Sequence, residues 1–507
     1  MTDDEQSLPN DIEQLKAMLL AERKQSAEQA ARLVFLEEQF RLAQQKQFGA
    51  SSEGHPGQGE LFNEAEELVA ETPVEKEDIS YTRNKPKRKP LPKTLPREVV
   101  IHDIAEEDKV CACCNNELHK IGEDKAEKLE FIPAQVKVIE HVRPKYACRA
   151  CEKSGISNHI KQAPVPPSVI PKGYATPSLL SQIITSKYQF GLPLYRQEAM
   201  FKQYGIELSR KTMADWMLRC ADLLTPLYDR LHELILKQGV IAADETTLKV
   251  VSEDKVKCYM WVYTSGADSP EGALPNTDTP NIVLYDYQSS RAGQCAVDYL
   301  QGYNGYLQVD GYAGYHKTQA TLAGCWAHAR RKFVEAKTAQ GKKSSGRADW
   351  ALNHIQKLYR IEAQIKGSPP DERQKIRQEK STILLKQFEA WLIKSESQVL
   401  AKSKLGEAIT YCLNQWGKLN TYTQDGHLNI DNNRAERAIK PFVIGRKNWL
   451  FSNTASGAKA SATLYSVIET AKANGIMPFD YMMYLLEQVS QPDHDIEQLL
   501  PWRSAKN

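Results

Sequence analysis

Long apolar stretches are missing from this chain. No run of about 18 apolar residues occurs in its 507 residues, and the polar N-terminus lacks the apolar core of a signal peptide. Cysteine is also scarce, with ten residues, which argues against a disulfide scaffold and favours free or metal-bound thiols. These absences predict a cytoplasmic protein without membrane contact. The length predicts several domains, because one hydrophobic core seldom supports so long a chain.

An excess of charge of one sign is missing too, since the formal net charge is only +2. The average hides segregation: residues 60–78 contain eight acidic residues and one basic residue, whereas residues 81–97 contain seven basic residues and no acid. Residues 49–97 as a whole are predicted to be a disordered linker, first acidic and then basic. Prolines keep the basic stretch 83–93 extended, which suits contact with DNA phosphates and equally suits a plain linker.

Residues 1–48 are predicted to be an N-terminal helix. Apolar residues within 11–47 follow one heptad frame, but polar Glu22, Ser26 and Gln29 occupy the middle of the seam. An imperfect coiled coil for self-association is one interpretation, and a helix packed on its own chain is the other.

Two Cys-x-x-Cys pairs lie in residues 98–165, the predicted zinc-ribbon-like domain. Cys111 with Cys114 and Cys148 with Cys151 offer four thiolates to one tetrahedral Zn²⁺, and Cys113 is an alternative ligand. The 33 residues between the pairs exceed the usual gap of about 15–20, but predicted strands at 128–132 and 135–139 fill it. Four thiolates leave no open position for substrate, so the zinc is predicted to be structural.

Residues 166–238 have helical periodicity. The segment 197–204, the turn at 205–209 and the segment 210–217 are typical of a helix-turn-helix. Ser209 is the predicted cap of the second helix, and Arg210 and Lys211 lie in its first turn, where such motifs meet DNA. The same geometry also occurs in proteins that never contact DNA.

Residues 239–480 are predicted to form a mixed α/β domain, followed by a tail at 481–507. Apolar runs predict strands that end at Asp244 and Asp310, with strands at 255–263 and 281–287 and a helix at 292–300 between them. If the two aspartate-bearing strands are parallel neighbours, both carboxylates lie at one end of the sheet. Either aspartate alone is equally consistent with a turn, where Asp is common.

Glu436 lies in a short predicted helix that starts near Asp431 and ends before Pro441. Taken alone, it also fits a capping box with Asn433. The long interval between Asp310 and Glu436 is explained by amphipathic helical spacing at about 344–425, which predicts a helical insertion. A short strand near Thr321 is predicted to run into a basic helix.

Motifs around these acids carry a resemblance to a known family. They include Ala243-Asp-Glu-Thr246, Val309-Asp-Gly-Tyr312 and Asn432-Asn-Arg-Ala-Glu436, within stretches at 192–197, 205–209, 243–246, 309–312, 324–333 and 432–449, with weaker similarity at 47–53, 90–92 and 95–98. In these stretches the chain resembles the insertion sequence sixty-six family of bacterial transposases, in particular its large TnpC-type protein. The similarity covers nearly the whole chain.

The resemblance implies a multidomain α+β protein with a ribonuclease-H-like catalytic core, in which Asp244, Asp310 and Glu436 are the DDE acids. Such a trio suits two Mg²⁺ or Mn²⁺ ions and metal-dependent cleavage and strand transfer of DNA. Intact acids argue against a DNA-binding protein whose catalysis has lapsed, and a metal-dependent nuclease or resolvase is the other alternative. Basic residues near the acids are the predicted DNA contacts: Arg330, Arg331, Lys332, Arg434, Arg437, Lys440, Arg446 and Lys447.

The implied partners are double-stranded DNA, both transposon ends and target, together with further copies of this chain and accessory transposon-encoded proteins. The implied location is the bacterial cytoplasm, on the nucleoid when DNA is bound.

Overall fold

The computed structural model describes residues 11–48, 98–99, 135–146, 161–254, 257–266, 280–340 and 346–504. The chain divides into two compact units, Pro73–Ala163 on the one hand and Met1–Thr72 with Pro164–Asn507 on the other. In the smaller unit, β1 (Lys145–Tyr146) pairs antiparallel with β2 (Lys161–Gln162). The strand predicted at 135–139 is wrong, because these residues have no regular structure and Val138 is 95% exposed. The four predicted zinc ligands and the strand predicted at 128–132 lie outside the described residues.

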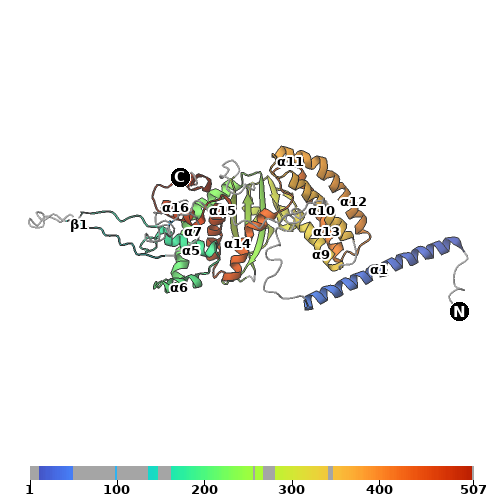
Figure 1. Cartoon of the computed structure of the whole chain (residues 1–507), viewed down its shortest axis with the longest axis horizontal. Helices are drawn as coiled ribbons and strands as arrows, with labels where there is room; N and C mark the ends of the chain where they lie inside the picture. The colour runs from blue at the N-terminus through green and yellow to red at the C-terminus, as the bar shows by residue number, and fades with distance from the viewer. Residues whose placement is uncertain are drawn as a thin grey trace, which may run out of the picture. The chain divides into compact units, whose positions relative to one another are not determined.

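A five-stranded sheet forms the centre of the larger unit (Figure 1). Its order is β5-β4-β3-β6-β7; the strands are β3 (Val240–Leu248), β4 (Cys258–Ser265), β5 (Ile282–Gln288), β6 (Tyr306–Gln308) and β7 (Thr321–Ala323). β5, β4 and β3 are antiparallel neighbours, whereas β3, β6 and β7 are parallel. The predicted strands and their mixed sheet are therefore confirmed. Two short elements follow the strands, α8 (Gly293–Tyr299) after β5 and the 3₁₀ helix η3 (Ala313–Lys317) after β6.

One group of helices packs on β5, β4 and β3. Its members are α5 (Pro177–Tyr188), α6 (Leu194–Gln203), α7 (Arg210–Ile235), α14 (Asn433–Trp449), α15 (Ala455–Ala473), α16 (Pro478–Val489), α17 (Ile496–Leu499) and α18 (Pro501–Ser504). α15 and α7 contact β5, α14 contacts β3 and β4, and the other members of the group pack mainly on helices. Small residues of α15 allow close approach to the edge strand β5, whose backbone would otherwise be unpaired. The Tyr285 N–H donates to Ser466 Oγ at 2.7 Å, and the Val283 N–H donates to Thr470 Oγ1 at 3.1 Å.

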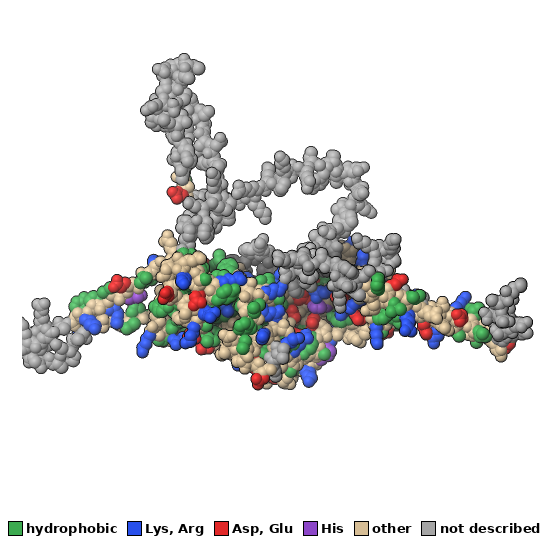
Figure 2. All heavy atoms as spheres, turned by 90° about the horizontal axis from the view of Figure 1, so that it is seen from below, with side chains coloured by type: hydrophobic (Ala, Val, Ile, Leu, Met, Phe, Trp, Pro, Cys, Tyr) green, Lys and Arg blue, Asp and Glu red, His purple; other side chains and the backbone are tan. Residues whose placement is uncertain are grey.

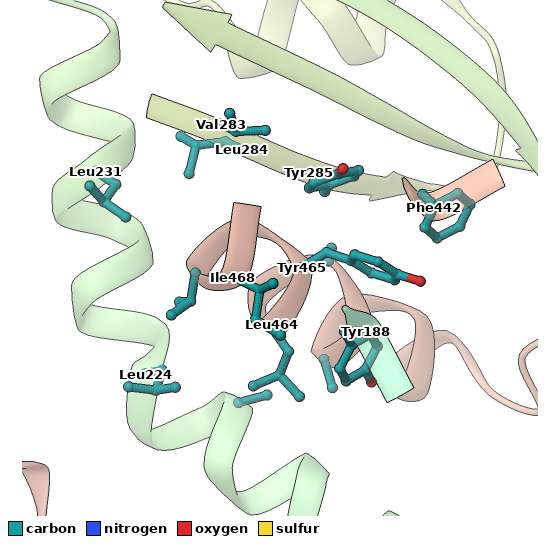
Figure 3. Close-up of a cluster of buried hydrophobic side chains, with 14 of the residues drawn as sticks. Tyr188, Leu224, Leu231, Val283, Leu284, Tyr285, Phe442, Leu464, Tyr465 and Ile468 are labelled. Atoms are coloured by element: carbon teal, nitrogen blue, oxygen red, sulfur yellow. The ribbon is translucent and has the colours of Figure 1, made fainter. Parts of the chain in front are cut away.

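The core between α7, α15 and β5 is drawn in Figure 3, where Leu224, Leu231, Leu464 and Ile468 face one another below Tyr285. The helix-turn-helix segment and the sheet share this core. So does Trp502 in the segment predicted as a tail.

The helix-turn-helix prediction agrees locally with the structure. α6 is followed by a turn in which Gly205 has φ +76°, and then by α7. Ser209 caps α7 as predicted, because its Oγ accepts from the Thr212 N–H at 3.1 Å. Arg210 and Lys211 are exposed in the first turn of α7.

The helical insertion predicted at about 344–425 forms a bundle with its own core, together with the basic helix predicted before it. It contains α9 (Trp326–Gln340), α10 (Arg347–Gln364), α11 (Pro370–Ile376), the π-helical turn η4 (Arg377–Ser381), α12 (Thr382–Glu396), α13 (Lys404–Asn420) and the 3₁₀ turn η5 (Thr421–Thr423). Buried Trp326, Phe333, Ile355 and Phe388 come from three of these helices. The chain therefore leaves the sheet after β7 and returns to it only before α14.

A long helix lies near the N-terminus, before the first described strand of the chain. α1 (Ile12–Phe48) confirms the predicted N-terminal helix. Its heptad residues Leu33, Leu36 and Phe40 are 63%, 55% and 65% exposed, so an apolar seam is open to solvent. No helix among the described residues is both long enough and apolar enough to span a membrane.

Candidate active site

Asp244 and Asp310 lie on neighbouring parallel strands. Ala242 of β3 is in register with Gln308 of β6, so the two aspartates occupy equivalent positions two residues further along each chain. Asp310 follows the end of β6, and its Oδ1 accepts from the Tyr312 N–H at 2.8 Å. Asp244 does not end its strand as predicted, because β3 continues beside β4 to Leu248. The turn interpretation of Asp244 is therefore wrong.

Asn432 connects the start of α14 to the sheet next to Asp244. Its side-chain Nδ2 donates to the Ala243 carbonyl at 2.8 Å, and its backbone N–H contacts Cys325 Sγ at 3.2 Å. Glu436, on the first turn of α14, is thereby brought to the end of the parallel β3–β6 pairing, beyond which both aspartates lie. The structure thus unites all three acids across the helical insertion.

The helix that carries Glu436 is longer than the sequence predicted. α14 continues through Pro441 to Trp449, so the predicted end before this proline is wrong. Proline removes one helical hydrogen bond, but packing offsets this loss. Phe442 is fully buried against the core, and the Tyr285 hydroxyl donates to the carbonyl of Ala438, close to the proline.

The Glu436 carboxylate is buried without good hydrogen bonds. Its side chain is 2% exposed, and its nearest basic neighbours are His328 Nδ1 at 3.3 Å and Arg331 at 3.5 Å. Burial lowers the pKa of His328 to about 4, so Arg331 is the charged one of the two near neutral pH. Neither of its oxygens has a hydrogen bond of normal geometry, and the helix has no side-chain cap, so the capping-box alternative is wrong. Burial raises the pKa of Glu436 to about 7, although Arg331 opposes the shift.

Repulsion among the acids adds to the cost of burial. The pKa of Asp244 is raised well above its usual value by burial first, and then by the negative charges of Glu245, Asp310 and Glu436. Carboxylates held together in this way either take up protons or bind cations. Oxygen ligands of this type are the ones that Mg²⁺ and Mn²⁺ prefer. The buried, poorly partnered oxygens of Glu436 and the raised pKa of Asp244 therefore fit a divalent-metal site.

Glu245, the neighbour of Asp244, is engaged elsewhere. Its carboxylate accepts from Arg291 Nε at 2.8 Å and from the Tyr315 hydroxyl at 2.6 Å. Successive residues of a strand point to opposite faces, so Glu245 and Asp244 face different surroundings. Because of these contacts, we do not count Glu245 among the candidate metal ligands.

Cys325, His328 and Glu436 also offer ligand atoms within 4.8 Å of one another. Cys325 is fully buried, and this burial raises the pKa of its thiol well above the usual value. Metals bind the thiolate rather than the thiol. We therefore assign Cys325 a packing role, in which its sulfur receives the Asn432 N–H.

The predicted DNA contacts fall into two groups. Some are already bonded within the chain: Arg434 donates to Asn281 Oδ1 at 2.6 Å, Arg446 donates to Thr246 Oγ1 at 3.0 Å, and Arg331 pairs with Glu436. The second group is described by its exposure: Lys447 is exposed, and Arg330, Lys332, Arg437 and Lys440 are half-buried and also have contacts within the chain. On the face drawn in Figure 2, Lys and Arg side chains recur among apolar and acidic ones.

Sequence reasoning missed two neighbours of the acids. His328 lies within the family-like stretch 324–333, and no pattern of its own indicates its contact with Glu436. Lys418, in the insertion, has no motif of its own and is recognised only from the fold.

Comparison with known proteins identifies the family. The model described as "Transposase IS66 family" matches residues 172–460, and "IS66 C-terminal element" matches residues 466–502. The chain belongs to the IS66 family of transposases. Two further IS66-related models match, "zinc-finger binding domain of transposase IS66" at 108–152 and "Transposase C of IS166 homeodomain" at 35–100. The zinc-finger match includes all four predicted cysteine ligands.

Relatives of similar length occur in Sinorhizobium fredii strain NGR234. The uncharacterized protein y4qI is 34% identical over 98% of this chain and 97% of its own. The uncharacterized protein y4jD is 37% identical over 81% of each chain. No solved structure matches this chain.

Proposed function

We propose that this IS66-family transposase cleaves DNA at transposon ends and joins the ends to target DNA in a metal-dependent reaction. The observation that carries the proposal is the convergence of Asp244, Asp310 and the buried Glu436 just beyond the parallel pairing of β3 with β6. We propose a ribonuclease-H-like core on the same ground, because the mixed sheet order places both aspartates side by side.

In the proposed chemistry, the three acids bind the metal ions and their neighbours hold Glu436 in position. Asp244, Asp310 and Glu436 would hold two Mg²⁺ or Mn²⁺ ions, which when bound activate the attacking oxygen and stabilise the leaving oxygen of an in-line displacement. Asn432 fixes the start of α14 on β3, so Glu436 is held in place before substrate arrives. His328 and Arg331 lie against Glu436 and limit its movement. No covalent intermediate with the protein is required.

The other regions are assigned by the same reasoning. We propose that Cys111, Cys114, Cys148 and Cys151 bind one structural Zn²⁺, and that Arg210 and Lys211 contact DNA from the first turn of α7. Lys447 at the end of α14 is the best exposed of the basic residues near the acids. Pairing of two transposon ends needs at least two catalytic sites, so we propose a homo-oligomer that works with accessory proteins.

Asp310→Asn tests the proposal, because the change is nearly isosteric and removes the ligand charge. In the presence of Mg²⁺ or Mn²⁺, the purified protein should nick DNA from the flanks of its gene at the terminal repeat. It should then join that DNA to a second duplex. The variant should lose both products by at least about 100-fold, as expected for loss of a metal ligand. Asp222→Asn, at an exposed position of α7, is the matched control and should keep them. Full activity of Asp310→Asn would overturn the metal assignment, and nicking without joining would favour a nuclease or resolvase.

A further inference from the structure

The helical insertion reaches the turn that carries Asp310. A Cβ atom at Gly311 would lie 2.7 Å from Cε2 of Tyr411, so the residue next to Asp310 packs directly on α13. At the other end of the contact, the Gly324 N–H donates to the Lys418 carbonyl at 2.8 Å. These contacts hold α13 against both the Asp310 turn and the strand next to it.

Lys418 brings a basic group to this place. Its ammonium contacts Nε2 of His316, which follows Asp310 on η3, and donates to Gln415 Oε1 at 2.8 Å. Two groups that are both able to carry positive charge are therefore adjacent on a surface open to solvent. Burial lowers the pKa of each, Lys418 also lowers that of His316, and the charge of Asp310 acts on Lys418 in the opposite direction.

A second cation comes from α9. Lys332 lies 5.1 Å from the centre of the Tyr411 ring, and the positive charges of Arg331 and Lys332 both act on His328. The Asp310 turn is thus bordered by basic side chains from α9, α13 and η3. An anion shared between an ammonium and an imidazole receives charge-assisted hydrogen bonds from both, which is the arrangement that phosphate prefers.

We propose that Lys418 and His316 bind a DNA phosphate beside Asp310, and that the insertion serves to hold Lys418 there. This inference rests on the proposed function, because it assumes that DNA reaches the three acids. As a neutral imidazole, His316 accepts from the Lys418 ammonium through Nε2, and this contact holds the ammonium beside the Asp310 turn. Gln415 takes a second N–H of Lys418, which leaves the third for a phosphate oxygen. Without the insertion, the sheet and η3 alone would leave His316 without this partner.

The test is the salt dependence of DNA binding by full-length Lys418→Gln. Binding is measured by fluorescence anisotropy across a KCl series without Mg²⁺ or Mn²⁺, with a duplex from the gene's flank and a duplex of unrelated sequence. Loss of one phosphate contact should reduce the slope of log K against log salt by about one, equally for both duplexes. At low salt the affinity should fall roughly tenfold. Lys418→Arg should restore most of it, because it keeps the charge and the donors.

Lys394→Gln is the matched control, since Lys394 is exposed on α12 of the same insertion. A cooperative thermal unfolding transition shows that each variant is folded. With Mg²⁺ present, Lys418→Gln is expected to raise KM by a larger factor than it lowers kcat. A folded Lys418→Gln protein with an unchanged salt slope overturns the inference. If that variant behaves as wild type while Asp310→Asn is inactive, only this inference fails. If the wild-type protein neither nicks nor joins the flanking DNA, the proposed function fails instead.

Discussion

Glu436 is expected to destabilise the metal-free protein above neutral pH. Its folded-state pKa of about 7 exceeds the ordinary value of 4.5, so the stability linked to its proton is present below about pH 4.5 and is lost as pH rises through 7. Glu436→Gln removes this loss. At pH 8 the variant should therefore unfold at a higher temperature than the wild type. Its free energy of unfolding should be larger by on the order of 3 kcal/mol, and this difference should shrink towards pH 5.

Calorimetry of metal-free protein at several pH values measures this difference. Glu372→Gln, at an exposed position of α11, is the control and should show no such trend. Added Mg²⁺ should raise the unfolding temperature of the wild type and leave Glu436→Gln nearly unchanged, because a ligand that binds only the folded state stabilises it. A difference between the two proteins that does not vary with pH would show that the carboxylate is not the cause.

Asp244 and Glu245 show how one position along a strand decides a residue's role. The alternation of β3 turns Asp244 towards Asp310 and Glu436, and turns Glu245 towards Arg291 and Tyr315. A one-residue shift in the pairing of β3 would exchange them. The seven paired residues from Ala242 to Leu248 along β4 fix this register.

At the scale of elements, Arg377 holds the insertion to the segment that returns to the candidate active site. Its guanidinium is fully buried, pairs with both oxygens of Glu362 at 2.9 Å and 2.6 Å, and donates to the carbonyls of Tyr422, Asp425 and Leu428. From there the chain is bonded to the sheet, where Gln308 Nε2 donates to the Asn429 carbonyl at 2.6 Å. The position of α14 thus depends on a clamp inside the insertion.

Arg377→Met should cost about 3–5 kcal/mol of stability, because it leaves the largely buried Glu362 carboxylate with only the more distant Arg373 at 4.0 Å and removes the donor to three carbonyls. The double variant with Glu362→Met should recover only part of this loss, since three carbonyls still lack their donor. Urea unfolding measures both. Arg360→Met, at an exposed position of α10, is the control. A cost below about 1 kcal/mol for Arg377→Met would mean that the clamp does not hold the bundle.

The sequence predicted the elements better than their ends. Strands with apolar runs and the amphipathic helices of the insertion were found, because hydrophobic periodicity records burial. Pro441 misplaced the end of α14, since local propensity is outweighed by the packing of Phe442. Asp244, Asp310 and Glu436 were found through family motifs, whereas Lys418 and the contacts of Arg377 depend on tertiary structure that no local pattern records.

At the scale of the whole molecule, α1 is the clearest candidate for assembly. Leu33, Leu36 and Phe40 expose apolar surface along one side of the helix, and such a seam is stable in water only when it is covered. A second copy of α1 would cover it. The polar residues in the middle of the seam limit the strength of the pairing. The main contact between two copies of α1 is therefore expected at Leu33, Leu36 and Phe40.

Replacement of Leu33, Leu36 and Phe40 by Gln in the full-length protein should therefore shift it towards monomer in sedimentation experiments. The unfolding temperature of the sheet core should stay the same, because its buried residues belong to the segments from Val169 onwards. Gln39→Ser, an exposed polar position of α1, is the control. If oligomers persist in the triple variant, another surface joins the copies. If strand joining falls with assembly while nicking by single copies remains, the pairing of two ends depends on α1.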